Sequence, residues 1–406
     1  MRRGLGAAIL TACAALPTQA LALWNDSVTP FVEEKATRDS NVFRLSSAPN
    51  PANPPDLPSG GDTYTTTSVG LNLDLPVSRQ RFQLGYAQNY SRYDRFTQLD
   101  FDGYDGKALW QWQVGNDASG QLSYAQSLAL ASFANVGGTT PDPLTTRQAL
   151  FNGTYMVTPS WRAQAGAGGF QQRNGDPALQ TIDVDIVSGD ASLSYATPAN
   201  SYIGLGVRGE NGRYPKRDFD PQTSVFDNAY RQYGVNLVAD WTATGVSHLS
   251  ARVGRVSRRN EHLPQRDFYG TSVLVQHDWT PTGKLSFNTT VVQDINPYDD
   301  IRASYVYVRG VSFRPKLSVT GKIDVSGIFE YSRRQYFGDP NLDPNPATPG
   351  SAGRTDRVRS ASGTLSYHPL RTLALQMSAQ RESRSSTIPF GDYVATVLSL
   401  SARLSF

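Results

Sequence analysis

Apolar and polar residues alternate one by one along most of the chain. The last segment shows this most clearly, with apolar residues at every second position: Leu398, Leu400, Ala402, Leu404 and Phe406. Polar residues occupy the positions between them: Ser399, Ser401, Arg403 and Ser405. Because successive side chains of a β-strand point to opposite faces, this period of two predicts strands with one apolar and one polar face.

The polar face is rich in charge. In the segment 317–331, Lys322, Asp324 and Glu330 lie opposite apolar residues such as Val325 and Phe329. A soluble sandwich would pack one of its faces against a second sheet. Lys, Asp, Glu and Arg on the same face of strand after strand favour a wet lumen, with the apolar face towards lipid.

The connections between these segments fall into two classes. Tight turns are predicted at 76–78, 116–117, 158–159, 197–198, 244–245, 282–283, at Arg314-Pro315 and at His368-Pro369. Longer polar segments lie mostly on the alternate connections, at 47–62, 134–144, 214–225 and 333–354. Short periplasmic turns that alternate with longer outer loops are typical of a bacterial outer-membrane barrel.

The pattern predicts an all-β protein, a single transmembrane antiparallel barrel of about 18 strands, with 16 as the alternative. The expected strands cover residues 28–46, 63–75, 80–93, 101–114, 120–133, 146–157, 160–173, 181–196, 201–213, 228–242, 247–260, 267–280, 284–296, 301–314, 316–332, 355–367, 372–386 and 391–406. Aromatic residues beside the short turns predict a periplasmic girdle: Trp112, Trp161, Tyr195, Trp241, Trp279, Tyr367 and Phe406.

The first 22 residues have the features of a secretion signal. Arg2 and Arg3 precede an apolar run from Gly4 to Leu16, and Ala20-Leu21-Ala22 is a small-x-small cleavage site. We therefore expect residues 1–22 to be removed and the barrel to occupy 23–406, in the Gram-negative outer membrane. Cys13 leaves an alternative open, because Leu10-Thr11-Ala12-Cys13 also fits the cleavage box of a lipoprotein.

Composition narrows the function further. Lys plus Arg number 38 against 35 acidic residues. Without Arg2 and Arg3 the mature balance is 36 to 35, which gives no basic excess for nucleic acid. The four histidines show no metal-ligand spacing and no Ser–acid pattern around them, so the sequence predicts neither an enzyme nor a metal site or cofactor.

The segment Asp39-Ser40-Asn41-Val42-Phe43-Arg44-Leu45-Ser46 and the terminal Phe406 carry a resemblance. Together with a barrel of this size, they resemble the EpsL-type outer-membrane proteins of exosortase-associated exopolysaccharide clusters. The resemblance implies an outer-membrane pore that exports an extracellular polysaccharide, with periplasmic export proteins as partners. Phe406 resembles the C-terminal signal read by the barrel-assembly machinery. For Asn41 and Arg44, the alternative is that they simply end the first strand.

An export pore needs polar lumenal side chains that bind a sugar chain weakly and repeatedly. The candidates on the polar faces are Arg162, Arg208, Glu210, Asp240, Arg252, Lys322, Asp324, Glu330, Gln376, Gln380 and Arg403. Arginine could hold carboxylated sugars through paired hydrogen bonds. Two alternatives stay open: in one, the charges pair with one another and only solvate the lumen; in the other, the barrel is a general or solute-specific porin for uptake. Loop 333–354 either constricts the pore or lies outside it.

Overall fold

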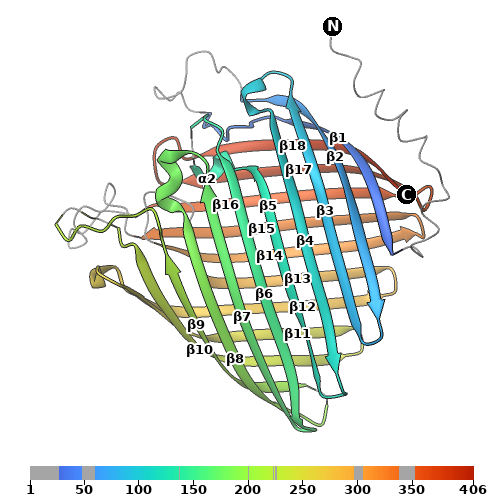
Figure 1. Ribbon diagram of the computed structural model, residues 1–406, viewed down its shortest axis with the longest axis vertical. Coiled ribbons are helices and arrows are strands. Elements are labelled where there is room, and N and C mark those ends of the chain that lie inside the picture. Colours follow the sequence, from blue (N-terminus) through green and yellow to red (C-terminus); the bar gives the residue numbers. More distant parts are fainter. Residues whose placement is uncertain are drawn as a thin grey trace.

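The computed structural model describes residues 27–47, 60–136, 138–199, 201–222, 224, 226–296, 305–337 and 353–406. Its strands form one 18-stranded antiparallel sheet, in which each strand pairs with its neighbours in the sequence. The first strand also pairs with the last, so the sheet closes into a barrel (Figure 1). The predicted fold class and the count of 18 are confirmed, and the alternative of 16 is wrong.

The strands of the first half are β1 (Val28–Asp39), β2 (Asp62–Val77), β3 (Gln80–Tyr93), β4 (Phe101–Val114), β5 (Ala118–Leu130), β6 (Pro143–Thr158), β7 (Trp161–Asn174), β8 (Val184–Ala196) and β9 (Tyr202–Arg213). Those of the second half are β10 (Ala229–Thr244), β11 (Ser247–Asn260), β12 (Phe268–Thr282), β13 (Leu285–Asn296), β14 (Tyr305–Thr320), β15 (Ile323–Phe337), β16 (Thr355–Tyr367), β17 (Leu373–Ser386) and β18 (Tyr393–Ser405).

Short turns join the strands at one end, and longer connections join them at the other. The longer ones contain the short helices η2 (Thr97–Leu99), α2 (Phe133–Val136), η3 (Pro177–Ile182) and η4 (Pro264–Arg266). No helix among the described residues is long and apolar enough to cross a membrane. The predicted signal peptide, Cys13 and most of loop 333–354 lie outside the described residues.

The alternation of the sequence gives the wall two faces. Apolar side chains point outward and stay exposed, as do Leu205 at 62%, Val235 at 61% and Leu400 at 62%. Exposed apolar side chains in strand after strand form a continuous band, which needs a hydrocarbon environment. The side chains between them point inward and are mostly polar.

Aromatic rings mark the outward face near the short turns. Stacked or edge-to-face pairs of neighbouring strands include Trp161 with Tyr195 (ring centroids 5.4 Å apart) and Trp279 with Phe287 (5.2 Å). Rings with an apolar body and a polar edge favour a membrane–water interface. The short turns therefore lie at the periplasmic side, and the longer connections form the outer mouth.

Several predicted boundaries differ by a few residues, and two differ most. β1 ends at Asp39 rather than at residue 46, because the chain turns inward after Ser40. The turn expected at Arg314-Pro315 lies at residues 321–322 instead, and both residues belong to β14. Pro315 faces outward there, and the β14–β15 register shows no partner for Arg314 or Pro315, consistent with the missing N–H of proline.

The seam between β1 and β18 carries more than backbone pairing. Its register runs from Phe31 opposite Ser405 to Asp39 opposite Val397. Inside the barrel, the hydroxyls of Thr37 and Ser399 lie 3.1 Å apart, and the guanidinium of Arg403 lies 3.6 Å from the ring centroid of Phe31. The seam is therefore closed by both main-chain and side-chain contacts.

Candidate functional site

The lumenal face is the candidate site, because it is the surface that a transported solute would meet. Of the residues predicted to face the lumen, the structure places these on inward positions of strands: Arg162, Arg208, Glu210, Asp240, Arg252, Asp324, Glu330, Gln376, Gln380 and Arg403.

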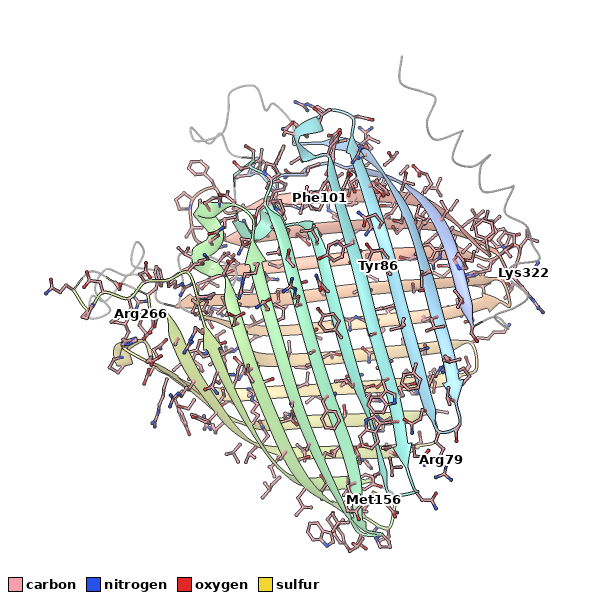
Figure 2. All side chains as sticks on the ribbon, viewed as in Figure 1. Arg79, Tyr86, Phe101, Met156, Arg266 and Lys322 are labelled. Carbon is pink, nitrogen blue, oxygen red and sulfur yellow. The ribbon has the colours of Figure 1, made fainter. Side chains whose placement is uncertain are left out.

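Lys322 is the exception. It lies in the turn between β14 and β15, beyond the strand ends, and its Nζ donates a hydrogen bond of 2.9 Å to the carbonyl of Pro369. Figure 2 shows Lys322 at the same end of the barrel as Arg79, another turn residue. The alternation of the sequence continues through Gly321 and Lys322, and this hid the turn.

Four of the predicted residues come together in one polar recess. The recess has a volume of about 270 Å³ and spans β6 to β12 on the inner wall. Its lining includes Arg162, Arg208, Asp240 and Arg252, together with Asn152, Gln164, Asp190, Ser192, Asn236 and Ser250. A recess lined by amides, hydroxyls and charges can exchange hydrogen bonds with a hydrophilic solute.

Asp240 organises the periplasmic side of the recess. Its two carboxylate oxygens accept from Arg162 Nη2 at 3.1 Å and contact His248 Nε2 at 2.6 Å. The Arg162 guanidinium also lies 3.6 Å from the ring centroid of Tyr202. These residues come from β7, β9, β10 and β11, so the cluster fixes the Arg162 side chain flat across several strands.

Arg208 is the second arginine whose side chain extends across neighbouring strands to an acid. From β9 it reaches Asp294 on β13, where two nitrogen–oxygen contacts of 2.8 Å form a bidentate pair. Ser272 on β12 lies between them, 3.2 Å from Arg208 Nη2 and 3.0 Å from Asp294 Oδ2. A Cβ at Gly234 would lie 2.8 Å from Arg208 Nε. Glycine at this position therefore leaves the path of the arginine free.

A third arginine lies buried nearer the outer mouth. Arg258 is 1% exposed, lies 3.9 Å from the ring centroid of Tyr230 and donates to Gln232 Oε1 at 2.9 Å. Glu210 accepts a 2.7 Å hydrogen bond from the Tyr230 hydroxyl and lies 3.8 Å from Arg258. Glu210 is thus part of the wall rather than a free lumenal group.

The other predicted residues are spread over the opposite wall. Asp324 accepts from Ser318 at 2.6 Å, and Glu330 accepts from Arg314 at 3.0 Å. Gln380 Nε2 donates to Ser360 Oγ at 3.4 Å, and Gln376 faces the lumen four residues earlier in the same strand. Arg403 lies 3.9 Å from Glu33.

Arg252 differs from the arginines around it. It lines the recess, yet no carboxylate within the described residues pairs with it. Asp190 lines the same recess and is exposed. The recess therefore offers one cation whose hydrogen-bonding capacity is open to a solute.

Sequence reasoning missed Asp294, His248 and Arg258, which complete the clusters. All three lie on inward positions of their strands, so extending the alternation two to six residues along each strand would have found them. Nothing in the sequence pairs Arg208 with Asp294, because four strand crossings separate them.

Charges of both signs occur in about equal numbers on the lumenal face. The inward cations are Lys35, Arg81, Lys107, Arg162, Arg208, Arg252, Arg258, Arg314, Lys316, Arg334, Arg384 and Arg403. The inward acids are Glu33, Asp39, Asp62, Asp74, Asp105, Asp190, Glu210, Asp240, Asp278, Asp294, Asp324, Glu330, Asp356 and Glu382. A balanced wall predicts weak selectivity between small ions.

The outer mouth is narrowed by three connections that pack together. Phe43 from the β1–β2 connection lies 4.7 Å from Phe96 and 4.9 Å from Phe133, measured between ring centroids. Arg384, on the lumenal face of β17, donates to the carbonyl of Ala134 in α2, six strands away round the wall. This contact requires the β5–β6 connection to fold inward across the mouth.

The segment that carries the family resemblance is part of this layer. Arg44 Nη1 contacts Asp39 at 2.8 Å, and Asn41 donates to the carbonyls of Leu45 at 2.8 Å and Val394 at 3.1 Å. Phe43 is 1% exposed. Asn41 and Arg44 thus follow the end of β1 and fix the chain over the seam with β18.

A second anchor holds the connection between β9 and β10. Asp227 accepts hydrogen bonds from the backbone nitrogens of His262 at 2.6 Å and Leu263 at 2.9 Å, and lies 3.1 Å from His262 Nδ1. Burial acts to raise the pKa of this carboxyl, but the hydrogen bonds from His262, Ala229 and Leu263 outweigh it and lower the pKa.

A closed barrel with an apolar outer band, an aromatic girdle and a polar interior defines the class: the protein is an integral β-barrel of the Gram-negative outer membrane. Its described residues hold no group of three or more His, Cys, Asp or Glu placed to bind a metal ion.

No family model matches the chain, and no curated protein matches it. Among solved structures it is similar to OpdK of Pseudomonas aeruginosa, crystallised with vanillate, at 12% identity over 94% of this chain and 99% of that chain, with a TM-score of 0.47. OccK2 (OpdF) of the same organism is 13% identical over 94% and 98%, with a TM-score of 0.47. A BenF-like porin from Pseudomonas fluorescens Pf-5 is 11% identical over 94% and 99%, with a TM-score of 0.47. Similarity at this level carries no information about a solute.

Proposed function

We propose that this barrel is a passive outer-membrane channel of the porin type, which admits small hydrophilic solutes. The observation that carries the proposal is the inward-folded layer at the outer mouth, fixed by Arg384 to β17, six strands away round the wall. A barrel of this strand number leaves an aqueous channel unless loops narrow it. A narrowed mouth above a polar recess suits solutes of limited size better than a continuous polymer.

The recess gives such a channel a weak binding step. Arg252 has no carboxylate partner among the described residues, so it can form paired hydrogen bonds with a carboxylated solute. The arginines beside it are held by Asp240 and Asp294 and contribute shape rather than affinity. One free cation among paired ones binds a solute without trapping it, as conduction requires.

Single-channel recording in planar bilayers tests the mouth. Replacing residues 131–142 by a short Gly-Ser linker removes the inward layer, and we expect conductance to rise and larger polyethylene glycols to enter the pore. The variant R384A removes the contacts of Arg384 with Ala134, Gly391 and Tyr393 but keeps the β5–β6 connection itself, so it should give a smaller rise. A conductance that stays unchanged in both variants contradicts a mouth narrowed by this layer.

Blocking by a carboxylated sugar, added as glucuronate, tests the recess. R252Q should weaken the block, whereas R314Q should leave it unchanged, because Arg314 is already paired with Glu330 on the other wall. Equal effects of the two variants would show that total lumenal charge, and not the recess, governs the block.

Polysaccharide export is the second candidate, and the segment Asp39–Ser46 together with Phe406 is the feature that favours it. In this case the layer at the mouth would have to open as polymer leaves the cell. Deleting the gene and measuring polymer outside the cell and in the periplasm separates the two functions. Loss of external polymer with periplasmic accumulation supports export, and unchanged polymer output leaves solute uptake as the better proposal.

A further inference from the structure

The outward face of the barrel carries charge on one side only. In the described strands, every outward-facing Arg, Lys, Asp or Glu lies on the half nearer the outer mouth, while the half nearer the short turns is apolar and aromatic. All the outward cations are arginines. This side of the wall faces the outer leaflet of the membrane.

Three of these arginines stand directly beside one another. The register of β14 and β15 sets Arg309 opposite Arg333, and that of β15 and β16 sets Arg333 opposite Arg357. These three strands are neighbours on the wall in Figure 1. Arg359 and Arg381, on β16 and its neighbour β17, extend the same patch. We call these five residues the arginine ladder.

The register and the neighbouring side chains show that the arginine ladder points outward. Arg309 shares its face with Val311 and Phe313, which are 42% and 38% exposed. Tyr331 precedes Arg333 by two positions on the same face and is 40% exposed. Arg309 and Arg333 therefore lie just beyond the apolar band, at the depth of the lipid headgroups.

The ladder has no acidic partner within the described residues. No ion pair joins any of its members to a carboxylate, in contrast to Arg92, paired with Asp102 at 2.6 Å, and Arg173, paired with Asp185 at 2.6 Å, on the same outward face. The Nε of Arg333 is buried without a hydrogen-bond partner. Like charges directly opposite on neighbouring strands repel. An anion that bridges the three guanidinium groups would remove this repulsion.

Guanidinium groups bind phosphate through paired, parallel hydrogen bonds, which an ammonium group cannot form. We propose that the arginine ladder is a binding site for a phosphorylated glycolipid of the outer leaflet. The lipid's phosphates bridge Arg309, Arg333 and Arg357, and its acyl chains lie along Val311, Phe313 and the apolar band below. The site is independent of the lumen and of what passes through it.

Native mass spectrometry of the full protein, purified and stripped of lipid in dodecyl maltoside, tests the site with diphosphoryl lipid A as the probe. The triple variant R309Q/R333Q/R357Q should bind this lipid about tenfold or more weakly than the unmodified protein. R333K, which keeps the charge but loses the planar fork, should fall between them. R92Q/R173Q is the matched control, because it removes two outward arginines that already have acidic partners.

Heat-modifiable mobility on gels establishes that each variant is a folded barrel before binding is measured. Weaker binding in the triple variant, with unchanged binding in R92Q/R173Q, supports the site. The proposal is overturned if the triple variant binds as tightly as the unmodified protein, if the control loses as much affinity as the triple variant, or if lipid A without phosphates binds equally well.

Discussion

Arginines occur on both faces of the wall, and their surroundings differ. Inside, Arg162 and Arg208 cross neighbouring strands to reach Asp240 and Asp294. Outside, Arg309, Arg333 and Arg357 stand side by side, and no acid in the described part of the chain pairs with them. In the lumen the counter-charge is built into the wall. At the arginine ladder no described residue supplies a counter-charge, so there the counter-charge must come from the surroundings.

This difference indicates which arginines stabilise the barrel and which are available to bind a solute or a lipid. A lumenal arginine that has its carboxylate is a structural part of the wall, and Arg252, which lines the recess without a carboxylate partner among the described residues, is the candidate for solute contact. An outward arginine without a partner contributes repulsion until a ligand covers it. Variants on the two faces should therefore change stability in opposite directions.

The largest effect is expected on the inside. Asp294→Asn leaves Arg208 without its counter-charge, and both side chains are only about one-fifth exposed, at 21% and 19%. We expect the free energy of unfolding to fall by about 2 kcal/mol. The freed cation should also shift the reversal potential of the channel towards anion selectivity. Urea unfolding in micelles and bilayer recordings in a salt gradient measure the two effects.

A smaller loss is expected when the path of the arginine is blocked instead of its partner. Gly234→Val places side-chain atoms where Arg208 crosses β10, since even a Cβ there lies 2.8 Å from Nε. We expect a loss of about 1–2 kcal/mol. In the double variant with Asp294→Asn the two losses should not add, because both act through the same ion pair. Additive losses would show that Gly234 matters for another reason.

On the outside, a variant should stabilise the protein. Arg333→Glu converts two repulsive neighbours into attractive ones, opposite Arg309 and Arg357. In neutral detergent we expect the free energy of unfolding to rise by about 0.5–1 kcal/mol. The same urea titration measures it. A loss of stability would contradict the view that the ladder is repulsive without a ligand.

The smallest effect concerns acid and the outer connections. The pKa of Asp227 is lowered in the folded protein, so its contribution to stability is present above the ordinary carboxyl pKa of about 3.9 and is lost as the pH falls below it. The protection of the amides of residues 261–263 against hydrogen exchange, relative to their intrinsic rates at each pH, should therefore fall from about pH 4 downward. Asp227→Asn should exchange faster already at neutral pH and show a flatter profile. Identical profiles would remove Asp227 as the anchor.

Face and strand order could be predicted from the sequence, because both follow from local alternation. β3, β4, β11 and β16 begin and end at the predicted residues. The prediction failed where a local sequence signal conflicted with the hydrogen-bonded pairing of the strands. Pro315 indicated a turn but lies in β14, and Lys322 continued the alternation but lies in the real turn.

Partners across the wall could not be predicted. The alternation within each strand places Arg208 and Asp294 on the lumenal face. Their contact, however, depends on the register of every strand between β9 and β13. The same holds for Arg384 and Ala134, which meet because the barrel closes and a connection folds across it. Such contacts arise because the strands assemble into a closed barrel, and the sequence of a single strand does not encode them.

The seam has a consequence for how the protein is made. Until Phe31 meets Ser405 and Asp39 meets Val397, the first and last strands are unpaired edges in a membrane that offers their main chain no hydrogen bonds. Joining residues this far apart in sequence carries the largest loop-closure entropy in the molecule. Insertion should accordingly be all-or-none. A chain that lacks β18 leaves an open sheet with unpaired edges that can pair with other strands, and only the complete chain forms a pore.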